Sequence, residues 1–193
     1  MEQPMRCKTL TAIYKNEINT LKKLYEIDFL IHESVRIHIE QFTVRKIEID
    51  FTSEQLVDDL IAVLTKVERL LMLFDGYFMN LISIEFQDSA GCVPPNLKEC
   101  AEHFMRRRLA YFHSNKILFS SNYLLDFSKV LTPALYEKWK GILEDLDVAH
   151  QVYLYSLCDT NQPVDLRCAF LIELAEPVVE IVKANSPLFE SLN

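Results

Sequence analysis

The sequence predicts an α+β fold: a mixed N-terminal part with short antiparallel strands and helices, then a C-terminal pair of long antiparallel helices. Residues 35–51 and 80–88 alternate apolar and polar side chains, which is typical of half-buried strands. Residues 132–187 instead repeat apolar side chains every three or four positions, as amphipathic helices do. The chain has only three glycines, which leaves few sites for tight turns and favours long helices.

The N-terminal part is expected to begin with a helix over residues 8–33, because its apolar residues follow a roughly helical spacing. Two short strands are expected in residues 35–51, where β-branched residues recur at every second position and favour a hairpin. The apolar positions are Leu10, Ile13, Ile18, Leu21 and Leu24 in the helix, and Val35, Ile37, Ile39, Val44, Ile47, Ile49 and Phe51 in the strands.

A second helix is predicted over residues 52–76. Thr52 and Gln55 have the spacing of a capping box, and Gly76 suits the C-terminal stop. Residues 80–88 predict a strand with Ile82, Ile84 and Phe86 on one face, and residues 89–99 indicate a loop by their Gly and Pro-Pro content. Residues 103–116 fit neither period, so either element remains open there.

The C-terminal part is expected to hold two long helices. Thr132 is placed to cap the first, with Pro133 at its first helical position. Pro163 opens the second, Pro177 is expected to kink it, and Pro187 closes it. The sequence thus predicts a mixed α+β region over residues 1–128 and a helical hairpin over residues 129–193.

Composition narrows the functional classes. The net charge of −8 argues against a non-specific nucleic-acid binder, and no DNA partner is expected. The five cysteines contain no CxxC, which favours free thiols in the cytoplasm over disulfides or a zinc site. No metal site is predicted, and the absence of glycine-rich phosphate loops predicts no nucleotide cofactor. No apolar run is long enough to span a membrane, and the first 30 residues do not resemble a signal peptide.

The stretch "HFMRRRLAYFHSNK" (residues 103–116) is the most basic in the chain. Arg106, Arg107 and Arg108 precede His113 at the spacings of an Arg-x4–6-His pair. Such a pair can support RNA cleavage, because histidine moves protons at neutral pH and arginine binds phosphate through two nitrogens. Arg108 and His113 are therefore the candidate catalytic residues. The three arginines are also candidates for contact with an anion or RNA.

Chance and geometry both argue against catalysis. With eight arginines and five histidines in 193 residues, one pair at such a spacing is expected by chance. On a straight helix Arg108 and His113 lie roughly 140° apart. The alternative to a catalytic role is a structural one, in which these arginines form a basic strip that pairs with an acidic surface.

Four segments, "LLMLFDGYF", "LLDFSKVLTPALYEKW", "LDVAHQVYLYSL" and "PVDLRCAFLIELAEPVVEIV", resemble ApeA-like HEPN proteins, which are bacterial and often linked to phage defence. The resemblance covers roughly residues 65–190. It implies a helical bundle, commonly dimeric, with a metal-independent RNase site at an Arg-x4–6-His motif on a late helix. That motif is expected after the helix that resembles residues 164–185, where the sequence holds only "SPLFESLN".

Three functional hypotheses follow. The first is a non-catalytic binding or regulatory part of an ApeA-like HEPN defence protein, an N-terminal part without the late catalytic helix. The second is a complete small HEPN-type ribonuclease that uses Arg108 and His113. The third is a cytosolic structural or interaction protein unrelated to HEPN. The expected partners are a second copy, through exposed apolar helix faces, and RNA.

Overall fold

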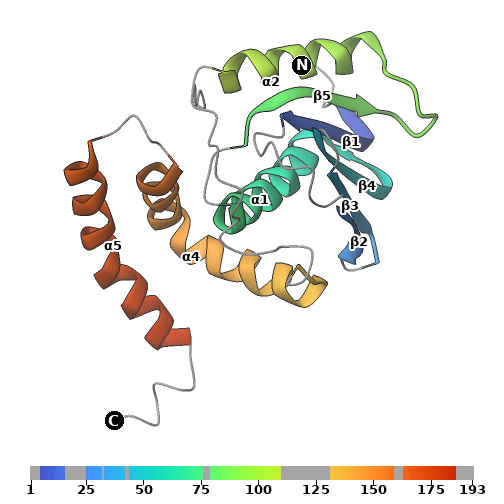
Figure 1. Ribbon diagram of the computed structural model, residues 1–193. Helices are drawn as coiled ribbons and strands as arrows, with labels where there is room; N and C mark the ends of the chain where they lie inside the picture. Colours follow the sequence, from blue (N-terminus) through green and yellow to red (C-terminus); the bar gives the residue numbers. More distant parts are fainter. Residues whose placement is uncertain are drawn as a thin grey trace.

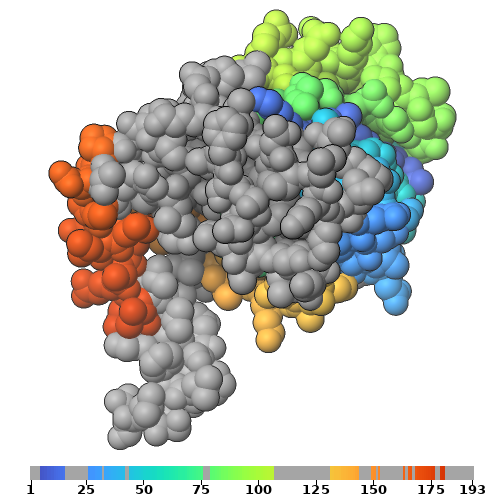
Figure 2. All heavy atoms as spheres, viewed as in Figure 1, coloured from blue at the N-terminus to red at the C-terminus, as the bar shows by residue number. Residues whose placement is uncertain are grey.

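The computed structural model describes residues 5–15, 25–31, 33–41, 44–75, 79–109, 131–158 and 163–185. Within them, helices pack on a five-stranded antiparallel sheet of order β2-β3-β4-β1-β5 (Figure 1). Figure 2 shows α2 and β5 at one end of the molecule, with α5 on the opposite side. The strands are β1 (Arg6–Lys15), β2 (Tyr25–Ile31), β3 (Val35–Gln41), β4 (Val44–Leu56) and β5 (Leu81–Gln87), and the helices are α1 (Val57–Asp75), α2 (Pro95–Leu109), α4 (Pro133–Cys158) and α5 (Val164–Asn185).

The core lies on one face of the sheet. Ile37 and Ile39 of β3 lie opposite Ile49 and Ile47 of β4, and all four are fully buried. Polar residues occupy the intervening positions and point to the other face, as the alternation of a strand requires. Helix α1 packs over β1 and β4 on the buried face. The two strands predicted within residues 35–51 are therefore confirmed, and they pair antiparallel.

The helix predicted over residues 8–33 is wrong, because the described parts of this range form strands β1 and β2. The prediction took Leu10 and Ile13 as one helical face, but in β1 they lie on opposite faces of the strand. Leu10, Ala12 and Tyr14 are buried at every second position, and Ile13 is on the less buried face. Pairing of β1 with both β4 and β5 thus decides the structure of this segment.

The helix predicted over residues 52–76 is confirmed as α1, but its predicted start is wrong. Strand β4 continues to Leu56, which lies opposite Arg6 of β1. The backbone N–H of Thr52 donates to the carbonyl of Ser34 at 3.0 Å, so Thr52 extends the sheet and does not cap a helix. The helix begins at Val57, with Asp58 and Asp59 in its first turn. Its fully buried leucines are Leu60, Leu64 and Leu71.

A buried polar cluster connects the sheet to the end of α1. Arg45 faces the core in phase with Ile47 and Ile49, and only 4% of its side chain is exposed. Its guanidinium donates to both carboxylate oxygens of Asp75, whose side chain is fully buried, and to Gln41 Oε1 at 2.8 Å. Because a buried charge is costly unless it is paired and hydrogen-bonded, these contacts fix where α1 ends on the sheet.

The predicted start of α4 is confirmed. The side-chain oxygen of Thr132 accepts a hydrogen bond from the backbone N–H of Leu135 at 3.2 Å, and its carbonyl accepts one from Tyr136 at 2.9 Å. Pro133 takes the first helical position, where its missing N–H costs nothing.

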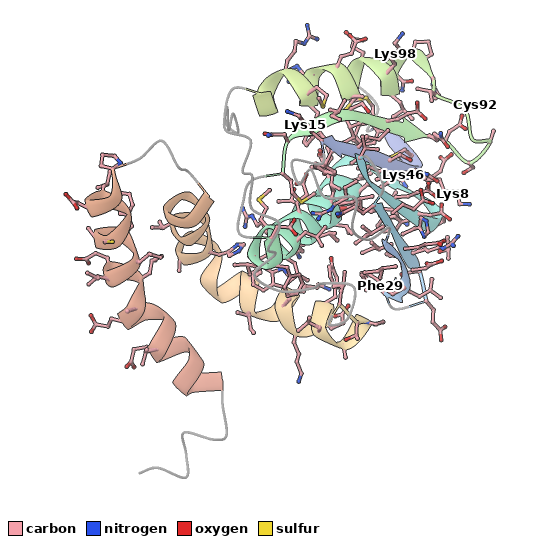
Figure 3. All side chains as sticks on the ribbon, in the orientation of Figure 1. Lys8, Lys15, Phe29, Lys46, Cys92 and Lys98 are labelled. Atoms are coloured by element: carbon pink, nitrogen blue, oxygen red, sulfur yellow. The ribbon has the colours of Figure 1, made fainter. Side chains whose placement is uncertain are left out.

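The predicted C-terminal pair of long antiparallel helices is wrong, and so is the fold class that includes it. The first turns of α4 pack on the sheet and α1: Leu131 and Tyr136 are buried in the core, and the Tyr136 ring lies 6.0 Å from that of Phe29 in β2. Phe29 lies at the end of the sheet nearest α4 (Figure 3). Trp139 Nε1 donates to the carbonyl of Lys66 in α1 at 3.2 Å. Figure 1 shows α4 changing direction before it reaches α5. The apolar repeat predicted a helix here but not its partner.

The predicted boundary between residues 128 and 129 falls within residues 110–130, outside the described residues, and stays a prediction. In the part of the chain that the structure describes, no helix combines the length and the apolar character that a membrane crossing requires.

Candidate functional site

Strand β5 lies at an edge of the sheet and pairs with β1 alone among the described residues. Ile84 and Phe86 are buried, whereas Ser83 and Glu85 are exposed and Ile82 is 51% exposed. An edge strand offers backbone N–H and C=O groups that can pair with another chain. The side of β5 on which no described strand pairs is therefore a surface on which a further strand can form.

Helix α2 runs beside β5 and forms a second wall. Leu97 and Ala101 are buried in the core, and Met105 packs against it. Because helical residues four apart lie on one face, Lys98 and Arg106 share a stripe on α2 with Glu102 between them. The stretch of residues 103–116, left open between helix and strand, is helical through Leu109. The loop expected over residues 89–99 ends earlier, because α2 already begins at Pro95.

The turn from β5 to α2 sets one end of this site. Gly91 has a φ of 73°, in the left-handed region that favours glycine. Asp88 Oδ1 accepts a hydrogen bond from the backbone N–H of Cys92 at 2.8 Å. Glu54 Oε1 of β4 accepts from the hydroxyl of Ser89 at 2.8 Å and from its backbone N–H at 3.1 Å. The turn is thus held against β4, which fixes the approach of α2 to β5.

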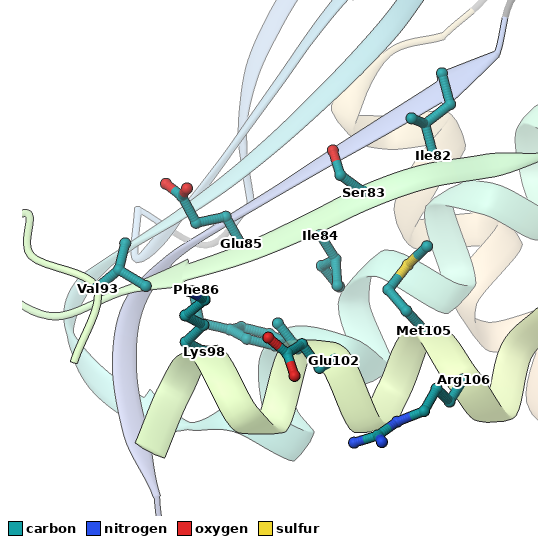
Figure 4. A pocket seen from close by; sticks show the side chains of 11 residues that line it. Ile82, Ser83, Ile84, Glu85, Phe86, Val93, Lys98, Glu102, Met105 and Arg106 are labelled. Carbon is teal, nitrogen blue, oxygen red and sulfur yellow. The ribbon is translucent and has the colours of Figure 1, made fainter. Parts of the chain in front are cut away.

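A groove of about 620 Å³ lies between β5 and α2 (Figure 4). Figure 4 shows Ile84 and Phe86 directed toward α2, with Ser83 and Glu85 on the other side of the strand. Five consecutive residues of β5 line the groove, so the strand runs along it. The lining consists of residues 82–86 of β5, Val93 of the turn, and Lys98, Ala101, Glu102, Met105 and Arg106 of α2.

Apolar and cationic groups are both available in the groove. Ile82 and Val93 are 51% and 39% exposed, so both offer apolar surface in the groove. Lys98 and Arg106 are exposed, and neither forms an ion pair with a residue that the structure describes. Such a surface can take an apolar side chain beside an acidic one.

The structure places one of the three candidate arginines in this groove. Arg106 lines it, while Arg107 and Arg108 belong to α2 with side chains outside the described part of the chain. His113 also lies outside the described residues. The candidate catalytic pair of Arg108 and His113 therefore stays a prediction.

The sequence did not indicate the groove as a site. It predicted Ile82, Ile84 and Phe86 on one face of a strand. The pairing of β5 with β1 shifts register between Ile13 and Tyr14, so Leu81 and residues 83–87 pair in different registers. As a result Leu81 is buried, and Ile82 is exposed although Ile84 and Phe86 are buried. The exposure of two β-branched residues, Ile82 and Val93, indicates the groove. This exposure can be recognised only once the order of the strands in the sheet is known.

Comparisons with protein-family models, with curated proteins and with solved structures found no match to this chain.

Proposed function

We propose that this chain is a binding module whose groove between β5 and α2 takes an extended peptide segment of a partner protein. The observation that carries the proposal is the position of the groove along a strand that is at the edge of the sheet among the described residues. Peptides that add a strand to a sheet gain affinity from backbone hydrogen bonds and specificity from alternate side chains. The helix beside β5 supplies the surface against which those side chains pack.

The lining suggests the chemistry of the occupant. Ile82, Val93 and Met105 offer apolar surface, and Lys98 and Arg106 offer positive charge beside the carboxylates of Glu85 and Glu102. The occupant is thus an extended segment with at least one apolar and one acidic side chain. RNA fits less well, because single strands bind through stacking on exposed aromatic rings. The only aromatic residue of the lining, Phe86, is fully buried.

The resemblance of residues 65–190 suggests the biological setting. In our proposal the module is the non-catalytic binding or regulatory part of an ApeA-like HEPN phage-defence protein that works in the cytoplasm. The support for this setting is the four sequence segments quoted above.

The proposal is tested with a displayed library of random linear peptides selected on the full chain. The enriched peptides are expected to share an acidic residue and an apolar residue in alternating positions. The affinity of one synthetic peptide is then measured by fluorescence polarisation. Arg106→Glu and Ile82→Asp are expected to weaken it at least about tenfold, because each places an unpaired charge in the contact.

Lys138→Glu provides the matched control, since Lys138 is an exposed cation on α4, away from α2 (Figure 1). It changes the net charge as Arg106→Glu does and is expected to leave the affinity unchanged. A library that yields no binder, or binders that are equally weakened by Lys138→Glu, would contradict the proposal. Binding of a short RNA that Arg106→Glu abolishes, without any peptide binding, would replace it.

A further inference from the structure

The face of the sheet opposite the core carries three potential metal ligands side by side. Glu26 of β2 lies directly opposite Glu40 of β3, and His38 is two positions before Glu40 on the same face. One ligand atom from each of the three side chains lies within 4.8 Å of the other two. The cluster is separate from the groove, which lies at the other edge of the sheet.

The surroundings of His38 favour a metal on one ring nitrogen. Its side chain is 13% exposed, and Nε2 lies 2.9 Å from Glu40 Oε1. When Nε2 donates to that carboxylate, Nδ1 is left as a buried acceptor with no hydrogen-bond partner among the described residues. A metal on Nε2 moves the proton to Nδ1, which faces Asp28 Oδ2 at 4.0 Å.

Arg36 holds the carboxylate of Asp28 in place beside His38. The guanidinium of Arg36 donates to both of its carboxylate oxygens, with Nε at 3.0 and 3.1 Å. In metal sites, a carboxylate that accepts a hydrogen bond from the second ring nitrogen of a bound histidine fixes its tautomer. At 4.0 Å from His38 Nδ1, Asp28 is too far for a hydrogen bond and contributes its negative charge.

The charges of the cluster also favour a cation. Like charges directly opposite each other on neighbouring strands are destabilising, and Glu26 lies opposite Glu40. The lysine on the other side of Glu40, Lys46, places its ammonium 2.8 Å from Glu48. Glu26 forms no ion pair with a described residue. A bound cation would offset the repulsion between the two carboxylates.

We propose that Glu26, His38 and Glu40 bind one divalent transition-metal ion, with Zn²⁺ as the best match to one imidazole and two carboxylates. The ligand atoms of a tetrahedral zinc site lie roughly 3.4 Å apart. Glu26 is exposed, so its side chain can close the remaining distance by rotation. Three protein ligands leave one position of the tetrahedron for water or for a group of a bound partner.

Zn²⁺ binding is measured on the untagged full chain after treatment with a chelator, by isothermal titration calorimetry. One ion per chain is expected, with a Kd on the order of micromolar. His38→Asn and Glu26→Gln are each expected to weaken binding at least about tenfold. The exposed position of Glu26 makes its variant informative even where His38→Asn fails to fold. Co²⁺ is expected to give a visible absorption band that Glu26→Gln reduces.

Two controls separate this site from others. Glu85→Gln removes an exposed carboxylate from β5 at the opposite edge of the sheet, and it is expected to leave the Kd unchanged. Cys92→Ser combined with Cys168→Ser removes two exposed thiols, which are competing zinc ligands, with the same expectation. No binding of Zn²⁺ up to about 100 µM, or binding that survives Glu26→Gln but is lost with the thiols, overturns the proposal.

Discussion

Cys7 shows how burial controls the chemistry of a single side chain. It is fully buried beneath the sheet, and burial, with smaller contributions from Cys100 and Glu54, raises the pKa of its thiol to about 12. Only the thiolate is a good nucleophile. The folded protein therefore holds an unreactive thiol at Cys7, whereas Cys92 and Cys168 are exposed.

We expect iodoacetamide at about pH 8 to modify Cys92 and Cys168 while Cys7 stays unmodified until the chain unfolds. Peptide mapping by mass spectrometry, with and without denaturant, measures the three rates. In denaturant the three cysteines are expected to react alike, which serves as the control. Modification of Cys7 in the folded protein at the rate of Cys92 would show that β1 is not in the core.

Arg45 and Asp75 provide the second test at the scale of residues. Arg45→Met alone leaves the buried carboxylate of Asp75 without its charged partner, so we expect a loss of about 3–5 kcal/mol in the free energy of unfolding. The double variant Arg45→Met, Asp75→Leu removes both charges and is expected to recover much of that loss. Urea denaturation measures both. Equal destabilisation by the single and the double variant would contradict the pairing.

At the scale of elements, the sequence predicts strands whose apolar and polar residues alternate regularly. It does not predict strands in which other apolar residues interrupt that alternation. The strands in residues 35–51 follow a strict period of two, because each buried isoleucine pairs with another across β3 and β4. In β1, Leu10 and Ile13 have a helical spacing, although they lie on opposite faces of the strand and only Leu10 is fully buried. The sequence therefore predicted a helix where pairing on both sides makes a strand.

The groove could not be predicted for a different reason. The strand in residues 80–88 was predicted, but its place at the edge of the sheet depends on β1 pairing with β4 as well. The end of α1 was predicted from Gly76, while its predicted start was wrong because β4 runs straight into Val57.

The buried charge of Arg45 could have been recognised in the sequence, because Arg45 lies in phase with Ile47 and Ile49. Its partner Asp75 lies 30 residues away, too far for a local pattern.

Helix α4 offers a test of whether it folds with the sheet. Trp139, the single tryptophan of the chain, donates to the carbonyl of Lys66 in α1 and is therefore a reporter of this contact. We expect the transition in tryptophan fluorescence on urea unfolding to coincide with that in far-UV circular dichroism, as in a two-state unit. Trp139→Phe is expected to cost about 1 kcal/mol through the lost hydrogen bond. A fluorescence transition at lower urea than the loss of the sheet would mean that α4 unfolds separately.

At the scale of the whole molecule, the described residues form one sheet with a polar face, a face covered by helices and a groove at one edge. Exposed apolar side chains on α5, at Leu166, Ile172 and Val179, agree with the expectation of self-association, which stays a prediction. The ApeA-like setting also stays a proposal, and it implies a division between a binding part and a catalytic part.

Catalysis is tested on the full chain with a labelled RNA and a chelator in place of metal. The binding-module account predicts that wild type and His113→Ala both leave the RNA intact. Arg106→Glu is included as a control for RNA binding without cleavage. Cleavage by wild type that His113→Ala removes would instead support the ribonuclease hypothesis based on Arg108 and His113.

The central claim is that β5 receives a peptide strand, and hydrogen exchange measures this most directly. The full chain is compared with and without a saturating peptide selected from the library, and exchange is followed by mass spectrometry. The account predicts slower exchange in residues 81–87 of β5, because its backbone amides gain hydrogen bonds, with smaller effects along α2. Slower exchange confined to β2, α4 or α5, with β5 unchanged, would contradict it.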